Sequence, residues 1–327
     1  MRRRDFITLL GSTAAAWSLA ARAQQPAMPV VGFVNAGSED ASIDRARAFR
    51  KGLNEAGYVE GQNVTVEYHW LEGRYDREPA LMADLVRRRV AMIAAWGAQS
   101  ALDAKAATTT IPIVFGVGQD PVQLGLVASL ARPGGNATGV NFFTSEVGTK
   151  QMGLLHELVP KAIRVAVLVN PANAAIAETT LRDAQKAGRA IGLQIHALNA
   201  STSREIDAAF ASLAPERPDA LVVAGDAFFA SRRTQLVTLT ARDRLPAAYA
   251  TREYVAAGGL MSYGSNIADT YHHIGVYVGS ILRGTKPADL PVVQSTKIEF
   301  VINLQTAKLL GIDVPPTLLA TADEVIE

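Results

Sequence analysis

Short apolar runs rich in β-branched residues recur along this chain, and each is followed by small or polar residues and then by a helical pattern. Such an alternation of strand and helix is typical of βα units arranged around a parallel sheet. The predicted strands of the first half cover residues 30–34, 64–68, 90–95, 111–117 and the approach to Val140, and those of the second half cover 165–169, 194–198, 220–223, 247–249 and 260–263.

The two series of strands align with each other, which indicates two similar lobes. The offset between matching strands stays between 130 and 135 residues, and an asparagine ends the first strand of each series, Asn35 in one and Asn170 in the other. Matches of this kind also arise by chance in α/β chains, but two open α/β lobes explain the constant offset better. Strands that begin at 30, 90 and 111 are matched by strands that begin at 165, 220 and 245.

Three segments are expected to cross between the lobes. A turn-forming cluster at 132–136 precedes the first crossover, and the Ala-Gly-Gly segment at 257–259 precedes the second. A predicted helix at 266–283 returns the chain to the first lobe, and a tail with a strand near 298–303 supplies the third crossover. Three connecting segments form a hinge that lets the lobes close without unfolding either one.

The predicted fold class is therefore α/β, with two Rossmann-like open parallel-sheet lobes joined by a three-crossover hinge. We assign residues 24–141 and 264–290 to the first lobe and residues 142–263 and 291–327 to the second. The roughly 300 residues after position 23 are about twice the length of a typical single domain, which agrees with two lobes.

Residues 1–23 have the features of a cleaved export signal. Arginines occupy positions 2–4, an apolar-leaning stretch follows at 7–20, and 21–23 have the small-x-small form that signal peptidase cleaves. The apolar stretch has about 14 residues, fewer than the ~20 that a membrane-spanning helix needs. The mature protein is expected to begin at Gln24. The paired arginines favour the twin-arginine route, and the general secretory route stays open as the alternative.

The composition excludes several kinds of site and partner. The chain has no cysteine, which rules out disulfides, thiolate metal sites, a cysteine nucleophile and a lipid anchor. The formal net charge is +1, to which residues 1–23 contribute +3, so the mature chain carries −2 and gives no reason to expect nucleic acid. An exported protein with no lipid anchor stays near the membrane only where a second membrane encloses it, so we expect it in the periplasm.

No catalytic motif is present in the sequence. It has no Gly-x-Ser-x-Gly elbow, no His-Glu-x-x-His pair, no phosphate loop and no complete Gly-x-Gly-x-x-Gly fingerprint. His272 and His273 are adjacent on a predicted helix, so their side chains point about 100° apart, which is poor geometry for one metal ion. His69, His156 and His196 have no partner at metal-ligand spacing. We therefore predict that the protein is not an enzyme and needs no cofactor or metal.

Polar residues gather where the predicted strands end, which is where ligands bind in open parallel sheets. Asn35 and Ser38 follow the first strand, where loop turning with N-capping explains them as well as ligand binding does. Gln99 and Ser100 follow a Gly-Ala lead into a helix, whose free backbone N–H groups suit a carboxylate. Asn141 lies where the chain is expected to cross over, a place that a closing cleft would compress.

Two acidic residues at strand ends are candidates to receive an ammonium group. Asp120 follows the fourth strand, where it is either a helix cap or a ligand-binding group. Asp226 follows the strand at 220–223, and N-capping of the next helix explains it equally well. Asn170 and Glu253 complete the polar candidates of the second lobe.

Four aromatic residues also lie near strand ends. Trp96, Phe142, Tyr249 and Tyr254 together suit a stacking wall for a planar or apolar solute, although any single one is more often part of a core. For an amino-acid-like ligand, helix N-termini near Ser38 or Ser100 would hold the carboxylate and Asp120 or Asp226 the ammonium group.

Several stretches resemble bacterial ABC-transporter substrate-binding proteins of the TrpX type. The resemblance implies the fold of type I periplasmic binding proteins, in which two Rossmann-like lobes are joined by three crossovers. Some members bind aromatic amino acids, but most solutes of the family are unassigned. The stretches are 118–122 (GQDPV), 130–140 (LARPGGNATGV), 258–264 (GGLMSYG), 281–292 (ILRGTKPADLPV) and 322–327 (ADEVIE).

We therefore expect an exported solute-binding component of an ABC importer. Its lobes would close around a small molecule, an amino acid or another aromatic or apolar organic solute, and present the closed surface to a permease at the inner membrane. We expect a monomer that binds no nucleic acid. A periplasmic sensory role for a chemoreceptor or histidine kinase is the alternative, and an exported hydrolase or isomerase is a weaker one because no nucleophile–base pair is visible.

Overall fold

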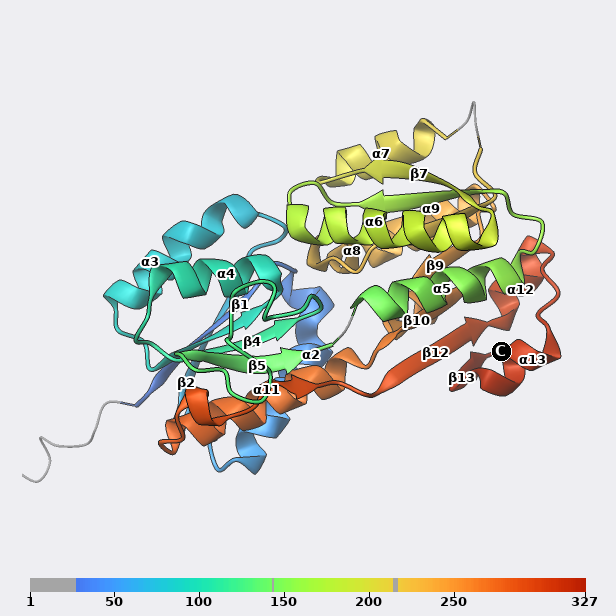
Figure 1. The fold of residues 1–327 in the computed structure, drawn as a ribbon. Coiled ribbons are helices and arrows are strands. Elements are labelled where there is room, and N and C mark those ends of the chain that lie inside the picture. Colours follow the sequence, from blue (N-terminus) through green and yellow to red (C-terminus); the bar gives the residue numbers. More distant parts are fainter. Residues whose placement is uncertain (1–27, 143, 214–216) are drawn as a thin grey trace, which may run out of the picture.

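The computed structural model describes residues 28–142, 144–213 and 217–327. The predicted export signal and its cleavage site lie outside these residues. Two α/β lobes lie side by side, and the chain ends on the second lobe (Figure 1). Among the described residues no helix is both long and apolar enough to cross a membrane.

The first lobe is built around a six-stranded sheet. Its elements are β1 Val30–Asn35, α2 Glu39–Glu55, β2 Thr65–Trp70, the 3₁₀ turn η1 Tyr75–Arg77, α3 Glu78–Arg87, β3 Met92–Trp96, α4 Ala98–Ala107, β4 Ile113–Val117, β5 Ala137–Asn141, α11 Ile267–Leu282, the 3₁₀ turn η2 Pro287–Asp289 and β11 Val293–Gln294. The strand order is β11-β5-β4-β3-β1-β2, and the pairings are parallel. Helices α2 and α11 cover one face and α3 and α4 the other (Figure 1).

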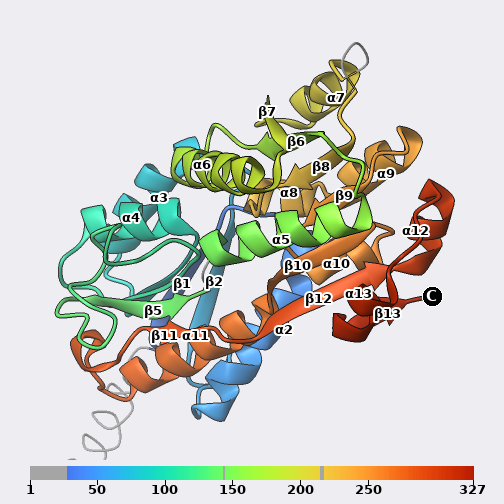
Figure 2. The same cartoon turned by 45° about the vertical axis from the view of Figure 1, so that its right-hand side comes forward.

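The second lobe is built around a seven-stranded sheet. Its elements are α5 Thr144–Leu158, β6 Arg164–Val169, α6 Ala174–Ile191, β7 Gln194–Asn199, α7 Ser203–Ala211, β8 Ala220–Val223, α8 Ala227–Ser231, α9 Arg233–Arg242, β9 Ala247–Tyr249, α10 Arg252–Ala256, β10 Met261–Ser265, β12 Ile298–Asn303, α12 Leu304–Leu310, α13 Pro316–Thr321 and β13 Glu324–Ile326. The order is β13-β12-β10-β9-β8-β6-β7, and β12 is antiparallel to β10. Helices α5 and α6 pack against each other (Figure 2).

Five strands of each sheet follow the same order. The first sheet contains β2-β1-β3-β4-β5 and the second contains β7-β6-β8-β9-β10, so the two lobes match position by position. This confirms the prediction of two open α/β lobes, and the predicted strand ends differ from the observed ones by at most two residues. Strands β3, β4 and β5 are buried along their whole length, which explains why the sequence shows continuous apolar runs instead of alternation.

The chain crosses between the lobes after β5, β10 and β11, which confirms the three predicted crossovers. Two strands depart from the predicted division of the chain. β10 stays in the second sheet as far as Ser265, which pairs with Ile298. β11, at Val293–Gln294, pairs with β5 of the first sheet, although 291–327 were assigned to the second lobe. A strand of two residues is too short to produce a recognisable sequence pattern.

Helices α2 and α11 pack with their backbones close together. A Cβ atom at Gly275 would lie 2.1 Å from the Phe49 carbonyl oxygen, and one at Gly52 would lie 2.0 Å from the His272 carbonyl oxygen. Neither position has room for a larger residue unless a helix shifts. This contact fixes α11, which returns from the second lobe, to the first helix of the first lobe.

The variant Gly275→Ala should therefore lose stability. The added methyl group collides with backbone atoms of α2, and overpacking of this kind costs about 1–3 kcal/mol or more in the free energy of unfolding. Urea denaturation of the mature chain measures the change. Gly153→Ala in α5 is the matched control, because nothing lies within 4 Å of its added Cβ, and it should be neutral or stabilising by up to about 1 kcal/mol. Equal stability of the two variants would contradict the close packing.

Candidate functional site

The carboxyl ends of the two sheets face each other across a cleft. In a sheet of this strand order, ligands bind at the switch point, which lies between β1 and β3 in the first lobe and between β6 and β8 in the second. Gly97 and Ser100 follow β3, Gly225 and Ala227 follow β8, and all four line one cavity. The cleft therefore joins the switch points of the two lobes.

One part of the cleft, here called the aromatic compartment, has aromatic rings from both lobes. Trp96 and Phe142 line it from the first lobe and Tyr254 from the second, and it holds about 620 Å³ including its open mouth. The rings of Trp96 and Phe142 stack with centroids 5.2 Å apart, and those of Tyr254 and Tyr249 stack with centroids 4.6 Å apart. Flat rings on both sides suit a planar or apolar ligand.

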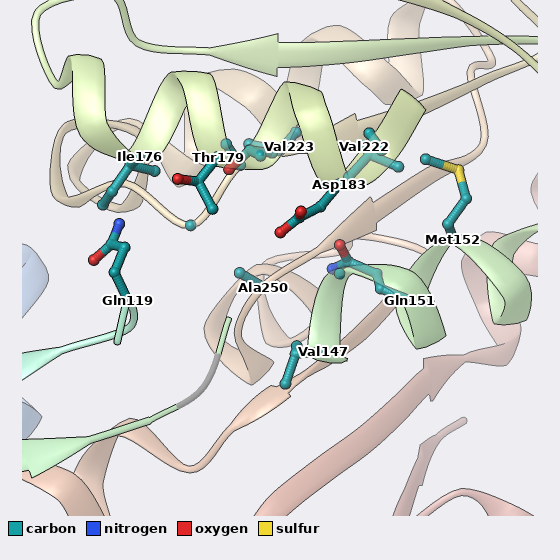
Figure 3. Close-up of a pocket in the computed structure, with 15 residues that line it drawn as sticks. Gln119, Val147, Gln151, Met152, Ile176, Thr179, Asp183, Val222, Val223 and Ala250 are labelled. Atoms are coloured by element: carbon teal, nitrogen blue, oxygen red, sulfur yellow. The ribbon is translucent and has the colours of Figure 1, made fainter. Parts of the chain in front are cut away.

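A second part of the cleft, here called the side pocket, lies between α5 and α6 (Figure 3). Val147, Gly225 and Ala250 line both the side pocket and the aromatic compartment, so the two cavities adjoin. Its walls are mostly apolar, and the Asp183 carboxylate points from α6 into the pocket, toward Gln151 of α5. The side pocket has room for an extension of a ligand that occupies the aromatic compartment.

Asp226 is buried and accepts hydrogen bonds on both carboxylate oxygens. Oδ1 accepts from Asn170 Nδ2 at 3.0 Å and from the Phe228 backbone N–H at 2.9 Å. Oδ2 accepts from Asn173 Nδ2 at 2.8 Å and from the Tyr75 hydroxyl at 2.9 Å. Tyr75 belongs to the first lobe, so this last bond crosses the cleft. Burial, and then the Asp226 charge, raise the pKa of Tyr75 well above its usual range, which keeps its hydroxyl a donor.

The hydrogen bond from the Phe228 backbone N–H makes Asp226 the N-cap of α8. N-capping was one of the two explanations of Asp226 that the sequence allowed. The acceptor positions of Asp226 are occupied by protein donors, so its carboxylate is less open to an ammonium group than the sequence suggested. Six predicted site residues line the cleft in the structure: Trp96, Gln99, Ser100, Phe142, Asp226 and Tyr254.

Seven other predicted residues lie outside the lining of these cavities: Asn35, Ser38, Asp120, Asn141, Asn170, Tyr249 and Glu253. Tyr249 is fully buried and its hydroxyl bonds to Thr240, so it backs the wall behind Tyr254 instead of facing the ligand. Asp120 is exposed, and its Oδ1 accepts the backbone N–H groups of Val122 and Gln123. Asp120 therefore stabilises the turn at 121–125, and the helix that it was expected to cap is absent from the described residues between β4 and β5.

The asparagines at the strand ends hold loops. Asn35 is buried, donates to the Tyr271 hydroxyl at 2.5 Å and accepts the Gly37 backbone N–H at 2.6 Å. Asn141 donates from Nδ2 to the carbonyl oxygens of Val117 and Gln119 at 3.1 and 2.8 Å. Both residues shape the walls of the cleft from behind, in keeping with the turn-forming explanation of Asn35.

Ser38 and Glu253 lie near the cleft without lining it. Ser38 is the N-cap residue of α2, but its side chain forms no capping hydrogen bond. Burial opposes ionisation of Glu253, yet the Arg45 guanidinium and the Thr251 hydroxyl hold the pKa of this carboxyl below its usual value. Glu253 therefore carries a negative charge at neutral pH on the second-lobe side.

Ser100 connects the cleft to a buried acidic pair. Its hydroxyl donates to Glu78 Oε1 at 2.7 Å, and Glu78 is fully buried. Burial raises the pKa of Glu78 to about 8, a rise that the Ser100 hydroxyl opposes and the Asp103 carboxylate increases. Gln99 donates to Asp103 Oδ1 at 3.1 Å, so Gln99 and Ser100, in the first turn of α4, contact Asp103 and Glu78 respectively.

The sequence reasoning missed Arg45, which lines the aromatic compartment and is 6% exposed. A signal for it exists in the sequence. The buried positions of α2 include Ser42, Ala46, Phe49 and Leu53, so Arg45 stands on the apolar stripe of an amphipathic helix. A charge in that place is costly unless it has a partner, and it therefore marks a candidate site.

Among the described residues no group of three or more acidic or histidine side chains could hold a metal ion.

Residues 29–326 match the model of a protein family described as ABC transporter substrate binding protein. The chain belongs to this family. The match covers nearly all of the described residues, including both lobes and the cleft between them. This membership and the architecture confirm the resemblance stated from the sequence.

Individual relatives agree with the family. A tyrosine-binding protein of Clostridioides difficile (strain R20291) is 28% identical over 275 residues, which cover 83% of this chain and 78% of that protein. A conserved domain protein of Vibrio cholerae has 26% identity and a TM-score of 0.82, over 91% of this chain and 99% of the other. A Streptococcus ABC domain in complex with L-Trp has 25% identity and a TM-score of 0.80, over the same shares.

The interlobe hydrogen bonds of Tyr75 predict the behaviour of Tyr75→Phe. The variant loses the bond to the buried Asp226 carboxylate, which contributes about 1.5–3 kcal/mol, and a longer bond that the hydroxyl accepts from Asn173 Nδ2 at 3.3 Å, so the ligand-free protein should populate open conformations more. Small-angle scattering should show a larger radius of gyration. Tyr277→Phe is the matched control, because its hydroxyl donates to the Pro291 carbonyl oxygen within the first lobe. A radius unchanged in Tyr75→Phe, or equally enlarged in both variants, would contradict the role of the bond.

Glu78 predicts a pH dependence of stability. Its pKa is 4.5 in ordinary surroundings and about 8 in the folded protein, so the folded state binds the proton more tightly. Stability should therefore fall as pH rises from about 4.5 to 8, by roughly 2–4 kcal/mol. The melting midpoint of the wild type should fall as pH rises across this range, and the midpoint of Glu78→Gln should change much less. The exposed Glu157→Gln is the control and should keep the slope; a flat wild-type profile would count against the raised pKa.

Proposed function

We propose that this protein is the exported solute-binding component of an ABC importer that captures an aromatic amino acid in the interlobe cleft. The observation that carries the proposal is the aromatic compartment, which Trp96, Phe142 and Tyr254 line. Phe142 and Tyr271 stack on Trp96, and Tyr249 stacks on Tyr254, so a ligand ring would contact the sides of this ring cluster that are open to the compartment. Such contact contributes most of the binding energy of aromatic ligands.

The polar groups around the rings support an amino acid in particular. Arg45 adds a positive charge on the first-lobe side of the compartment, and Glu253, close behind the lining on the second-lobe side, adds a negative charge that Arg45 stabilises. A zwitterion with an aromatic side chain matches both the charges and the rings. The tyrosine-binding relative and the L-Trp complex of the Streptococcus domain support the same ligand class.

Closure of the lobes would connect binding to transport. The ligand contacts rings from both lobes, so it favours the closed arrangement over the open one. A permease at the inner membrane would then recognise the closed surface and receive the solute. The proposed site of action is the periplasm, reached through the export signal at 1–23, with the protein acting as a monomer.

A ligand panel tests the proposal. L-Tryptophan, L-tyrosine and L-phenylalanine should each raise the melting midpoint of the mature chain, because a ligand that binds the folded state stabilises it. L-Alanine and glucose should not. Isothermal titration calorimetry then measures the affinity of the strongest ligand. No shift with any aromatic amino acid would refute the ligand class.

The variant Trp96→Leu should weaken binding of the aromatic ligand by about 10-fold or more, because it removes a stacked ring from the wall. Trp70→Leu is the matched control, since Trp70 packs on Phe33 and Tyr68 away from the cleft. Melting of both ligand-free variants checks that they fold. Equal affinities of the two variants would show that the ligand does not contact Trp96.

A further inference from the structure

Arg45 is a buried cation with a free donor at the wall of the aromatic compartment. Its side chain is 6% exposed and lines the compartment together with Trp96 and Tyr254. Its Nε has no hydrogen-bond partner among the described residues. A guanidinium that is taken out of water costs free energy unless its N–H groups are paired. The guanidinium therefore lacks a full set of protein partners, and the compartment that it lines is the place where a ligand would supply an acceptor.

Tyr271 lies near the Arg45 guanidinium. Burial raises the pKa of the Tyr271 hydroxyl and the Arg45 charge opposes that rise, and the hydroxyl accepts a bond from Asn35 Nδ2 at 2.5 Å. The Tyr271 ring stacks on Trp96 with centroids 4.0 Å apart. Because Arg45 is buried, packing restricts its side chain before a ligand arrives, which lowers the entropy cost of binding.

The charges around Arg45 are divided between the lobes. Arg45 projects from α2 of the first lobe, whereas Asp226 lines the compartment from the second lobe. Glu253, on α10, is near enough for the Arg45 charge to act on its carboxyl group. A ligand with a negative end toward the first lobe and a positive end toward the second fits this arrangement.

We propose that Arg45 binds the carboxylate of the cleft ligand and restricts the protein to ligands that carry one. The inference rests on the proposed function, because an aromatic amino acid supplies the carboxylate and the ring together. A guanidinium donates two parallel hydrogen bonds to a carboxylate, a geometry that an ammonium group cannot match. Arg45 takes the role that the sequence assigned to the helix N-termini near Ser38 and Ser100.

The test compares ligands with and without a carboxylate on the same variants. L-Tryptophan is paired with tryptamine and L-tyrosine with tyramine, and titration calorimetry measures each affinity for the wild type, Arg45→Gln and Arg45→Lys. Arg47→Gln is the matched control, because Arg47 lies on the same helix with a side chain that is 71% exposed and pairs with Asp44. Melting of each ligand-free variant is recorded as well.

The wild type should bind the amino acid at least about 30-fold more tightly than the matching amine, and Arg45→Gln should remove most of this preference. Arg45→Lys should bind the amino acid about 10-fold more weakly and the amine with little change in affinity, because lysine keeps the positive charge but lacks the two parallel N–H donors of the guanidinium. Arg47→Gln should match the wild type. Since Arg45 lacks a full set of partners, Arg45→Gln should melt no more than a few degrees below the wild type without ligand.

Other outcomes would overturn the inference in distinguishable ways. Equal losses for amino acid and amine in Arg45→Gln would give Arg45 a structural role only and leave the aromatic ligand class intact. If only a non-aromatic amino acid such as L-leucine binds, the proposed function fails, and the comparison of L-leucine with isopentylamine tests Arg45 in the same way. If the wild type binds only ligands without a carboxylate, both proposals fail. If Arg45→Gln does not fold, the ratio of the affinities for the amino acid and the matching amine is measured in Arg45→Lys instead.

Discussion

The Asp226 carboxylate lies out of water beyond the end of β8, and a buried charge has to be hydrogen-bonded on both oxygens. Donors of the second lobe supply three of its bonds, and the fourth comes from Tyr75 of the first lobe. The same carboxylate therefore starts α8, holds the loop after β6 through Asn170, and joins the lobes. All four bonds to Asp226 form only when the lobes are close, so this residue favours that spacing of the cleft walls.

Arg45 is the opposite case on the other side of the cleft. Asp226 has protein donors at all its bonds, whereas Arg45 keeps Nε without a partner. One buried charge thus has its partners within the protein, and the other is the one that we propose to meet the ligand carboxylate. Proteins retain an incompletely paired polar group mainly where function requires it, since filling the position with an apolar residue would be more stable. The contrast separates the structural centre of the cleft from its recognition centre.

Much of the architecture could be predicted because buried parallel strands produce continuous apolar runs, and the repeated order revealed two lobes. Trp96, Phe142 and Tyr254, which were expected near strand ends, all line the aromatic compartment. The reasoning failed where the direction of a side chain decides the outcome: Tyr249 ends a strand like the others but points into the core. Arg45 could not be found from strand ends because it lies on a helix. Strand β11 could not be predicted because two residues make no recognisable pattern.

The strength of the interlobe bond limits what it can do alone. One hydrogen bond to a charged group contributes about 1.5–3 kcal/mol, whereas moving an equilibrium from 1:99 to 99:1 takes about 5.5 kcal/mol. The bond between Tyr75 and Asp226 can therefore bias the lobes toward closure but cannot fix them there. The remainder has to come from a ligand that contacts both sides, as a ring between Trp96 and Tyr254 would. In the proposed function, docking on a permease would have to offset only a few kcal/mol to release the solute.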